Sequence, residues 1–299
     1  MTESLSDSKP IQLGNQILRP QLTGRDLYRH CAPGRFRVRL DISYDGANYS
    51  GWQKQVDSVG NETQPTIQGE LEKAVRRLFG EPLSVVGASR TDAGVHAQMQ
   101  VAHFDCGKDP RLFKDLRYTL QRLTPPDIVI KRVYLASPNF HSIATVNAKT
   151  YRYSILNRTT PSALRYKTTW WVRRELDLNW LKAAADELVG EHDFKSFQTS
   201  GTPVDSTVRT IYSAHWDRSL EHPDTLIFTI RGNGFLKQMV RNVVGTCVDF
   251  AKQSRGTDAI RDLIAHKDRR KAGQTAPAHA LFLAHMEYPA ELDNQLIPL

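Results

Sequence analysis

The chain has 299 residues, more than one typical domain, so we expect two domains or one elongated double unit. Apolar residues make up 40% and charged residues 24%, as in ordinary globular proteins, which excludes a disulfide-rich miniprotein and a wholly disordered chain. Lys and Arg number 40 against 32 Asp and Glu, and the net charge of +8 favours a polyanionic partner.

The cysteines and the N-terminal sequence bear on the cellular compartment. Cys31, Cys106 and Cys247 are far apart and form no CxxC pair, which predicts reduced thiols and no zinc site. The first residues lack a basic segment followed by an apolar run, and no stretch approaches the length of an apolar membrane span. We therefore expect a cytoplasmic protein without a membrane segment.

The first half of the chain begins with residues 1–34, whose mixed polar sequence has no sustained period and predicts a poorly ordered N-terminal extension. Residues 36–44 alternate apolar and polar, the pattern of a strand with one face in water. Thr66, after a proline, opens a predicted helix. Apolar runs at 83–88 and 101–104 predict strands on either side of a polar loop.

A second helix is expected after Asp109, an N-cap residue followed by a proline at the first helical position. Its predicted buried stripe consists of four leucines at helical spacing: Leu112, Leu116, Leu120 and Leu123. A strand at 128–135 completes the order strand, helix, strand, strand, helix, strand. This order is typical of a ferredoxin-like or RRM-like unit.

The second half shows the same alternation. Strands are predicted at 150–156, 208–216 and 226–231, with a helix over about 179–190 and another that begins near Phe235. The fold class predicted from these elements is α+β, with two ferredoxin-like or RRM-like units whose antiparallel sheets join across a central basic cleft.

The predicted boundaries follow from this division. An N-terminal α+β domain over 35–140 carries the polar loop between strands, and a C-terminal α+β domain covers 141–290. Residues 291–299 are expected to form a tail.

The polar loop at 90–96 reads Arg-Thr-Asp-Ala-Gly-Val-His and places the carboxylate of Asp92 two residues after the guanidinium of Arg90. Gly94 lets the backbone approach a ligand closely. An aspartate in such a loop is commonly a turn residue, so the loop alone does not indicate catalysis.

Three further segments accompany this loop. Residues 45–53 read Asp-Gly-Ala-Asn-Tyr-Ser-Gly-Trp-Gln, residues 149–153 read Lys-Thr-Tyr-Arg-Tyr, and residues 239–245 read Met-Val-Arg-Asn-Val-Val-Gly. With four motifs in this order, the chain resembles the bacterial tRNA pseudouridine synthase A family over roughly residues 36–289. The resemblance implies the pseudouridine synthase fold and isomerisation of uridine at tRNA nucleotides 38 to 40, in the anticodon stem-loop.

The resemblance also implies roles for individual residues. Asp92 matches the aspartate that acts as nucleophile or base, and Arg90 matches the arginine that enters the RNA helix as the target nucleotide flips out. Tyr151 matches the tyrosine that packs on the flipped uracil, and Leu281 matches an apolar wall of the uracil pocket. Arg241 matches the basic residue that pairs with the aspartate. By the same resemblance we expect a homodimer in which one tRNA contacts both subunits.

The implied chemistry is consistent with the residues present. Moving C1′ from N1 to C5 of uracil neither oxidises nor hydrolyses the substrate, so no cofactor and no metal are required. A carboxylate in a mostly dry pocket loses its charge unless a cation lies beside it, which is the role expected of Arg241. Whether Asp92 attacks C1′, adds to C6 or removes a ribose proton stays open, because each needs the same carboxylate in nearly the same place.

Contacts to tRNA phosphates are expected from basic side chains outside these motifs. The candidates are Arg111, Arg158, Arg165, Lys195 and Arg209. Phe140 and His141 resemble part of a family turn that contacts RNA, although Ile143 stands where relatives commonly carry arginine.

Two other functions are compatible with the sequence. One is a non-catalytic tRNA-binding or RNA-folding factor on the same scaffold, against which Asp92, Tyr151 and Arg241 argue. The other is a base-removing glycosidase that uses its aspartate in the same way and releases free uracil.

Overall fold

The computed structural model describes residues 12–13, 16–17, 30–199, 201 and 204–299. The predicted N-terminal extension, 1–34, thus lies mostly outside the described residues. Within it, β1 (Gln12–Leu13) and β2 (Gln16–Ile17) pair antiparallel. Near its end Cys31 is buried and donates its N–H to the carbonyl of Pro138 at 3.2 Å. All three cysteines are buried and free.

The alternating segment at 36–44 forms β3 (Phe36–Tyr44), and its apolar side chains are buried as predicted, except that Phe36 at its start is only partly buried. The expected wet face is wrong, because Arg37, Arg39 and Asp41 on the other face are buried too. Their charges are paired: Arg37 contacts Asp105 at 2.7 Å and Arg39 contacts Asp41 at 2.8 Å. Pairing of this kind is what allows charged side chains to be buried.

The first helix follows its local signals. The hydroxyl of Thr66 accepts the N–H of Gly69 at 3.2 Å and begins α1 (Ile67–Phe79), which ends at Gly80 with φ 76°. The second predicted helix is interrupted. Asp109 caps only the 3₁₀ turn η1 (Pro110–Leu112), and α2 (Leu116–Leu123) begins after it.

The reason for the interruption is a second capping residue. Asp115 accepts the N–H of Tyr118 at 2.7 Å and starts α2 anew, after an extended residue at Phe113. Leu112 therefore lies outside the buried stripe, with 73% of its surface exposed, and the prediction that it is buried is wrong.

The N-terminal half of the sheet contains β4 (Val86–Gly87), β5 (His96–Cys106) and β6 (Ile128–Ala136) in addition to β3. β3 pairs antiparallel with β5 on one side and β6 on the other, and β4 pairs with β5. Only two residues of the predicted strand at 83–88 are paired.

The C-terminal half contains β7 (Ala148–Asn157), β11 (Thr225–Gly232), β10 (Val208–Arg218) and β9 (Gly190–Asp193) as successive antiparallel neighbours, with β8 (Trp170–Val172) parallel to β7. Three helices complete it: α3 (Leu178–Asp186), α4 (Met239–Lys252) and α5 (Asp258–His266). The predicted helix over 179–190 ends at Asp186, and the helix expected near Phe235 begins at Met239. No helix in the described segments is long and apolar enough to cross a membrane.

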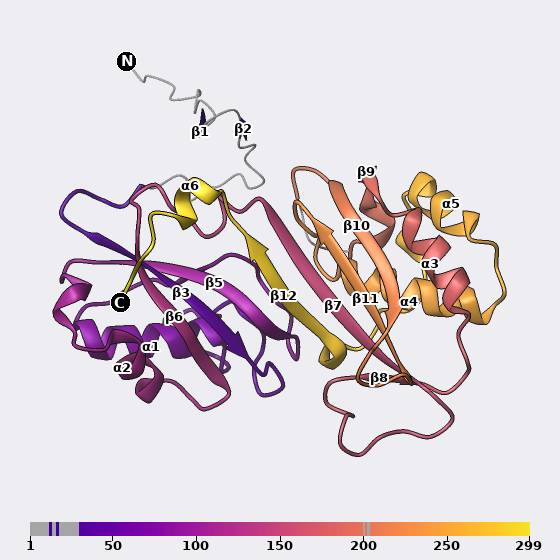
Figure 1. Cartoon of the computed structure of the whole chain (residues 1–299), viewed down its shortest axis with the longest axis horizontal. Helices are drawn as coiled ribbons and strands as arrows, with labels where there is room; N and C mark the ends of the chain where they lie inside the picture. The colour runs from indigo at the N-terminus through magenta and orange to yellow at the C-terminus, as the bar shows by residue number, and fades with distance from the viewer. Residues whose placement is uncertain (1–11, 14–15, 18–29, 200, 202–203) are drawn as a thin grey trace.

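The two halves share one mixed sheet, in the order β13-β6-β3-β5-β12-β7-β11-β10-β9. The joining strand is β12 (Leu281–Glu287), which pairs parallel with β5 and antiparallel with β7 and crosses the middle of Figure 1. The expectation of two antiparallel sheets is therefore corrected to one sheet with parallel contacts at this junction. The predicted boundary after residue 140 lies in the connection between β6 and β7, and the sheet continues across it.

The C-terminal residues, expected to be a tail, are part of the fold. Leu292 in α6 (Ala290–Asp293) is buried, and β13 (Ile297–Pro298) pairs antiparallel with β6. Asp293 contacts Arg39 at 2.6 Å, which places this segment over the charged face of β3. The end of the chain thus covers the N-terminal half of the sheet (Figure 1).

Candidate active site

The loop that carries Asp92 connects β4 to β5 and is held by its neighbours. The hydroxyl groups of Thr91 and Tyr44 lie 2.8 Å apart in a buried hydrogen bond. The carbonyl of Thr91 accepts the N–H of Trp52 at 3.0 Å, and the carbonyl of Asp92 accepts the N–H of Val95 at 3.1 Å. Both the backbone and one side chain of the loop are thus fixed before any ligand binds.

Gly51 allows the preceding loop to approach this one closely. Its φ of +98° is a conformation that other residues rarely adopt, and a Cβ there would lie 2.5 Å from the carbonyl oxygen of Thr91. The close contact places the 45–53 motif directly against the Asp92 loop.

Substituting Gly51 by alanine is therefore expected to lower the free energy of unfolding by about 3 kcal/mol, since a strained φ adds to a steric clash. Gly60→Ala is the matched control, because Gly60 has φ +88° with open space around it, and its expected loss is about 1 kcal/mol. Urea unfolding of both variants measures the difference, and equal losses would show that the contact with Thr91 has no energetic weight.

The carboxylate of Asp92 meets a cation from the other half of the protein. Nη1 of Arg241, in the first turn of α4, lies 3.2 Å from Oδ2 of Asp92. Nε of Arg241 donates to the carbonyl of Ala276 at 2.8 Å, which orients the guanidinium. The side chains of Asp92 and Arg241 are 26% and 14% exposed, so the pair is shielded yet still reachable from solvent.

Tyr151 lies beside this pair on β7. Its hydroxyl is 2.9 Å from the hydroxyl of Ser89, and its ring meets the ring of Phe235 edge-on at 5.1 Å. Burial raises the pKa of Tyr151 to about 12, and the charge of Asp92 adds to the rise while the bond to Ser89 opposes it. The tyrosine is therefore neutral throughout the physiological pH range.

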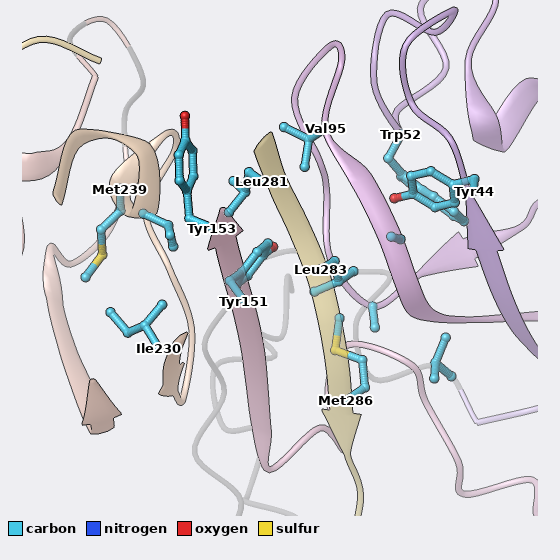
Figure 2. Packing of buried hydrophobic residues seen from close by; sticks show 14 of the residues in the cluster. Tyr44, Trp52, Val95, Tyr151, Tyr153, Ile230, Met239, Leu281, Leu283 and Met286 are labelled. Carbon is cyan, nitrogen blue, oxygen red and sulfur yellow. The ribbon is translucent and has the colours of Figure 1, made fainter. Parts of the chain in front are cut away.

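Leu281 begins β12, the strand next to Tyr151, and is 5% exposed. Figure 2 shows the side chains of Tyr151 and Leu281 on adjacent strands, with Val95 and Tyr44 on the other side of β12. The structure thus brings together four of the five residues that the sequence assigns to the pocket, from segments far apart in the chain.

Arg90, the fifth, is exposed and forms no hydrogen bond or ion pair with the rest of the described chain. On either side of it the loop is held, through Ser89 and Thr91. A free cationic side chain on a fixed loop is suited to contact a ligand outside the protein surface.

Sequence reasoning missed residues that support the loop, of which His96 is the clearest. Its Nδ1 accepts the N–H of Gly46 at 3.1 Å, and its Nε2 lies 3.0 Å from the carbonyl of His279. The ring stacks on Phe282 of β12 at 4.9 Å between centroids. The only signal in the sequence is that this histidine closes the 90–96 motif.

The basic residues expected to contact RNA lie at several places on the surface. Arg111 is 56% exposed and paired with Asp109 at 2.7 Å. Arg158 and Arg165 both contact Asp224, at 3.0 and 2.9 Å, and the hydrogen bond from Arg165 lowers the pKa of that carboxyl to about 2.

The other two candidates lie in the C-terminal half. Lys195 is exposed in the 3₁₀ turn η2 (Phe194–Phe197). Arg209 is partly buried at the start of β10 and donates to the carbonyls of Ser206 and Val208.

The side chains of Phe140 and His141, which the resemblance places in an RNA-contacting turn, are both buried. Phe140 is fully buried, with the guanidinium of Arg39 5.3 Å from its ring centre and Tyr288 at 5.0 Å. His141 is 6% exposed, and its Nδ1 accepts the backbone N–H of Ile143 at 3.2 Å. Both side chains thus stabilise the turn from inside.

No group of three or more His, Cys, Asp or Glu side chains among the described residues has the arrangement of a metal site. The side chains described above give the site one carboxylate, cationic groups and aromatic and aliphatic walls. Such a set can stabilise or transfer charge on a planar ligand next to Tyr151.

Comparison with known proteins completes the description of the site. The profile of a family described as "tRNA pseudouridine synthase" matches residues 42–141 and 184–289, more than half of the chain. A tRNA pseudouridine synthase A of Bdellovibrio bacteriovorus is 42% identical over 265 residues, covering 88% of this chain and 99% of the relative. Proteins of the same name from Brevibacillus brevis and Acetivibrio thermocellus are each 41% identical, covering 84% of this chain and 99% of the relative. The first matched range of the profile includes the Asp92 loop, and the second includes the first turn of α4.

Proposed function

Because the chain belongs to the tRNA pseudouridine synthase A family, we infer that it is an isomerase that converts uridine to pseudouridine in tRNA. This is the family that the four motifs predict. Its proposed targets are nucleotides 38, 39 and 40 of the anticodon stem-loop, the positions typical of the family. The observation that carries the proposal is the ion pair between Asp92 and Arg241 beside Tyr151.

The reaction is balanced within the substrate. The bond between N1 and C1′ breaks, a bond between C5 and C1′ forms, and the proton on C5 is replaced by one on N1, with no change in composition or oxidation state. The residues at the site supply what this requires. Arg241 places a cation 3.2 Å from the carboxylate of Asp92, and Tyr151 and Leu281 offer apolar surface to the uracil ring.

The uridine must leave its stack to reach Asp92, at a cost of a few kcal/mol. Arg90, exposed and unpaired among the described side chains, is proposed to occupy the space that the base vacates. We also propose that the two halves are related α+β units in the pseudouridine synthase arrangement around a basic cleft. The resemblance further supports a homodimer in which one tRNA contacts both subunits.

One experiment separates the three candidate functions. The protein is incubated with an unmodified tRNA transcript, pseudouridine is mapped by position, and free uracil is assayed. Pseudouridine at nucleotides 38 to 40 without free uracil supports the isomerase. Release of uracil would indicate a glycosidase, and tRNA binding without any change of uridine would indicate a scaffold protein.

Replacing Arg90 by alanine is expected to lower turnover by roughly 10- to 100-fold, because part of the cost of base flipping is no longer offset. The dissociation constant for tRNA should change less than about threefold, since one exposed cation contributes little to a large interface. Single-turnover rates and equilibrium binding measure the two effects.

Arg76→Ala is the control, because Arg76 is another exposed arginine, in the last turn of α1, and is not among the residues expected to contact tRNA. We expect turnover of bound tRNA to be unchanged in this variant. If Arg90→Ala weakens binding and turnover equally, Arg90 is an anchor for the RNA and has no part in base extrusion.

A further inference from the structure

Lys149 lies on β7 two residues before Tyr151, so the two side chains share one face of the sheet. Its Nζ donates to the carbonyl of Ala88 at 2.8 Å. Ala88 directly precedes Ser89, whose hydroxyl contacts Tyr151. The ammonium group is therefore next to the strand end that leads into Arg90 and Asp92, and neither the motifs nor the reaction above assigns it a role.

Lys149 is a cation without a carboxylate partner among the described residues. Its side chain is partly buried, and burial together with the charge of Arg209 lowers the pKa of Lys149 to about 8. Placing two cations together in a shielded position is unfavourable unless an anion joins them. Here the nearby hydrogen-bond partner is a neutral carbonyl.

The sheet register explains why Arg209 is near. Lys149 pairs with Gly232 of β11, and Gly232 pairs with Ile211 of β10, two residues from Arg209. The guanidinium of Arg209 uses Nη1 for the carbonyls of Ser206 and Val208. Within the described chain it too has no ion pair with a carboxylate, so its other N–H groups are available.

We propose that Lys149 and Arg209 bind one phosphodiester group of the RNA, next to the uridine that faces Asp92. The inference rests on the proposed function, because it takes RNA as the ligand. A phosphodiester carries one negative charge and only accepts hydrogen bonds, whereas the ammonium has three N–H groups and uses one for Ala88. By binding there, the phosphate fixes the flipped nucleotide relative to the loop that carries Asp92.

The experiment measures tRNA affinity as a function of salt concentration, in an Asp92→Asn background so that binding is observed without turnover. Each phosphate neutralised contributes about 0.7 to 0.9 to the log-log slope. The double variant of Lys149 and Arg209 is expected to lower the slope by about this amount, because it removes one neutralised phosphate. Lys149→Met and Arg209→Met should each lower the slope by part of it and weaken binding roughly tenfold. Lys149→Arg keeps the charge and should retain the wild-type slope.

Lys131→Met is the matched control. Lys131 also donates from Nζ to a strand carbonyl, that of Gln98 at 3.2 Å, but it is exposed and on β6. We expect its slope to be unchanged. The double variant of Lys149 and Arg209 should lose less affinity than the product of the two single losses, because both contact the same phosphate.

A wild-type slope in both Lys149→Met and Arg209→Met would overturn the proposal. If Lys149→Met loses turnover but keeps the wild-type tRNA affinity and salt slope, Lys149 does not bind a phosphate and only positions the backbone at Ala88. If Lys149→Met does not fold, the salt slopes of Arg209→Met and Lys149→Arg still test whether the two cations bind a phosphate. A failure of the proposed function gives a different result, because the wild-type protein would then form no pseudouridine at all.

Discussion

Asp92→Asn is expected to reduce pseudouridine formation by about 10⁴-fold or more, while tRNA binding stays within a few-fold of wild type. Asparagine has the shape of aspartate but no charge, so it neither attacks a carbon nor accepts a proton. The loop itself should persist, because its contacts run through Thr91 and the backbone carbonyl of Asp92. Each of the three possible roles of the carboxylate predicts this loss.

Single-turnover formation of pseudouridine and equilibrium binding of the same tRNA test this result. Asp217→Asn serves as the control, because it makes the same chemical change at an exposed position on β10. Its activity should equal that of the wild type. Turnover in Asp92→Asn at more than a tenth of the wild-type rate would remove Asp92 from the reaction.

Arg241→Met is expected to lower turnover by roughly 10²-fold, which corresponds to about 3 kcal/mol of lost stabilisation. Methionine retains much of the aliphatic volume but removes the charge 3.2 Å from Asp92 and the bond to Ala276. In this variant no cation lies beside Asp92, so the negative charge of its carboxylate loses its electrostatic partner in a shielded site. Because both side chains are partly exposed, the melting temperature should change little.

Arg241→Lys distinguishes charge from geometry. It keeps a cation near Asp92 but lacks the planar fork that contacts Ala276 and Asp92 together. We expect a loss smaller than that of Arg241→Met, measured by single-turnover rates at saturating enzyme. If the lysine and methionine variants lose equal activity, orientation by the fork and not the charge is what the site requires.

Features that depend on nearby residues were predictable. Thr66 begins α1 as its capping chemistry predicts, and the apolar periods locate most strands to within a few residues. Where two local signals compete, prediction is less certain. Asp109 and Asp115 are both capping residues. Because α2 begins only after Asp115, Leu112 lies outside it and is exposed.

The candidate site was predictable as a set of residues but not as an arrangement. The resemblance pairs Asp92 with Arg241, and the structure places them 3.2 Å apart across 149 positions. The sequence places Lys149 in a motif but gives it no role, because its partner is the backbone carbonyl of Ala88, which leaves no mark in the sequence. The burial of Phe140 could not be predicted, because it depends on Arg39 and Tyr288, which are remote in the chain.

By itself, then, the sequence determined the helix caps, the apolar periods, the four motifs and the family. The tertiary structure decided that β12 joins both halves into one sheet, that charged side chains fill a buried face of β3, and that Arg209 comes to lie near Lys149. The physical reason is the distance along the chain over which each interaction acts. Capping and periodicity act between residues a few positions apart, whereas strand pairing and ion pairs depend on which distant segments the folded chain brings into contact.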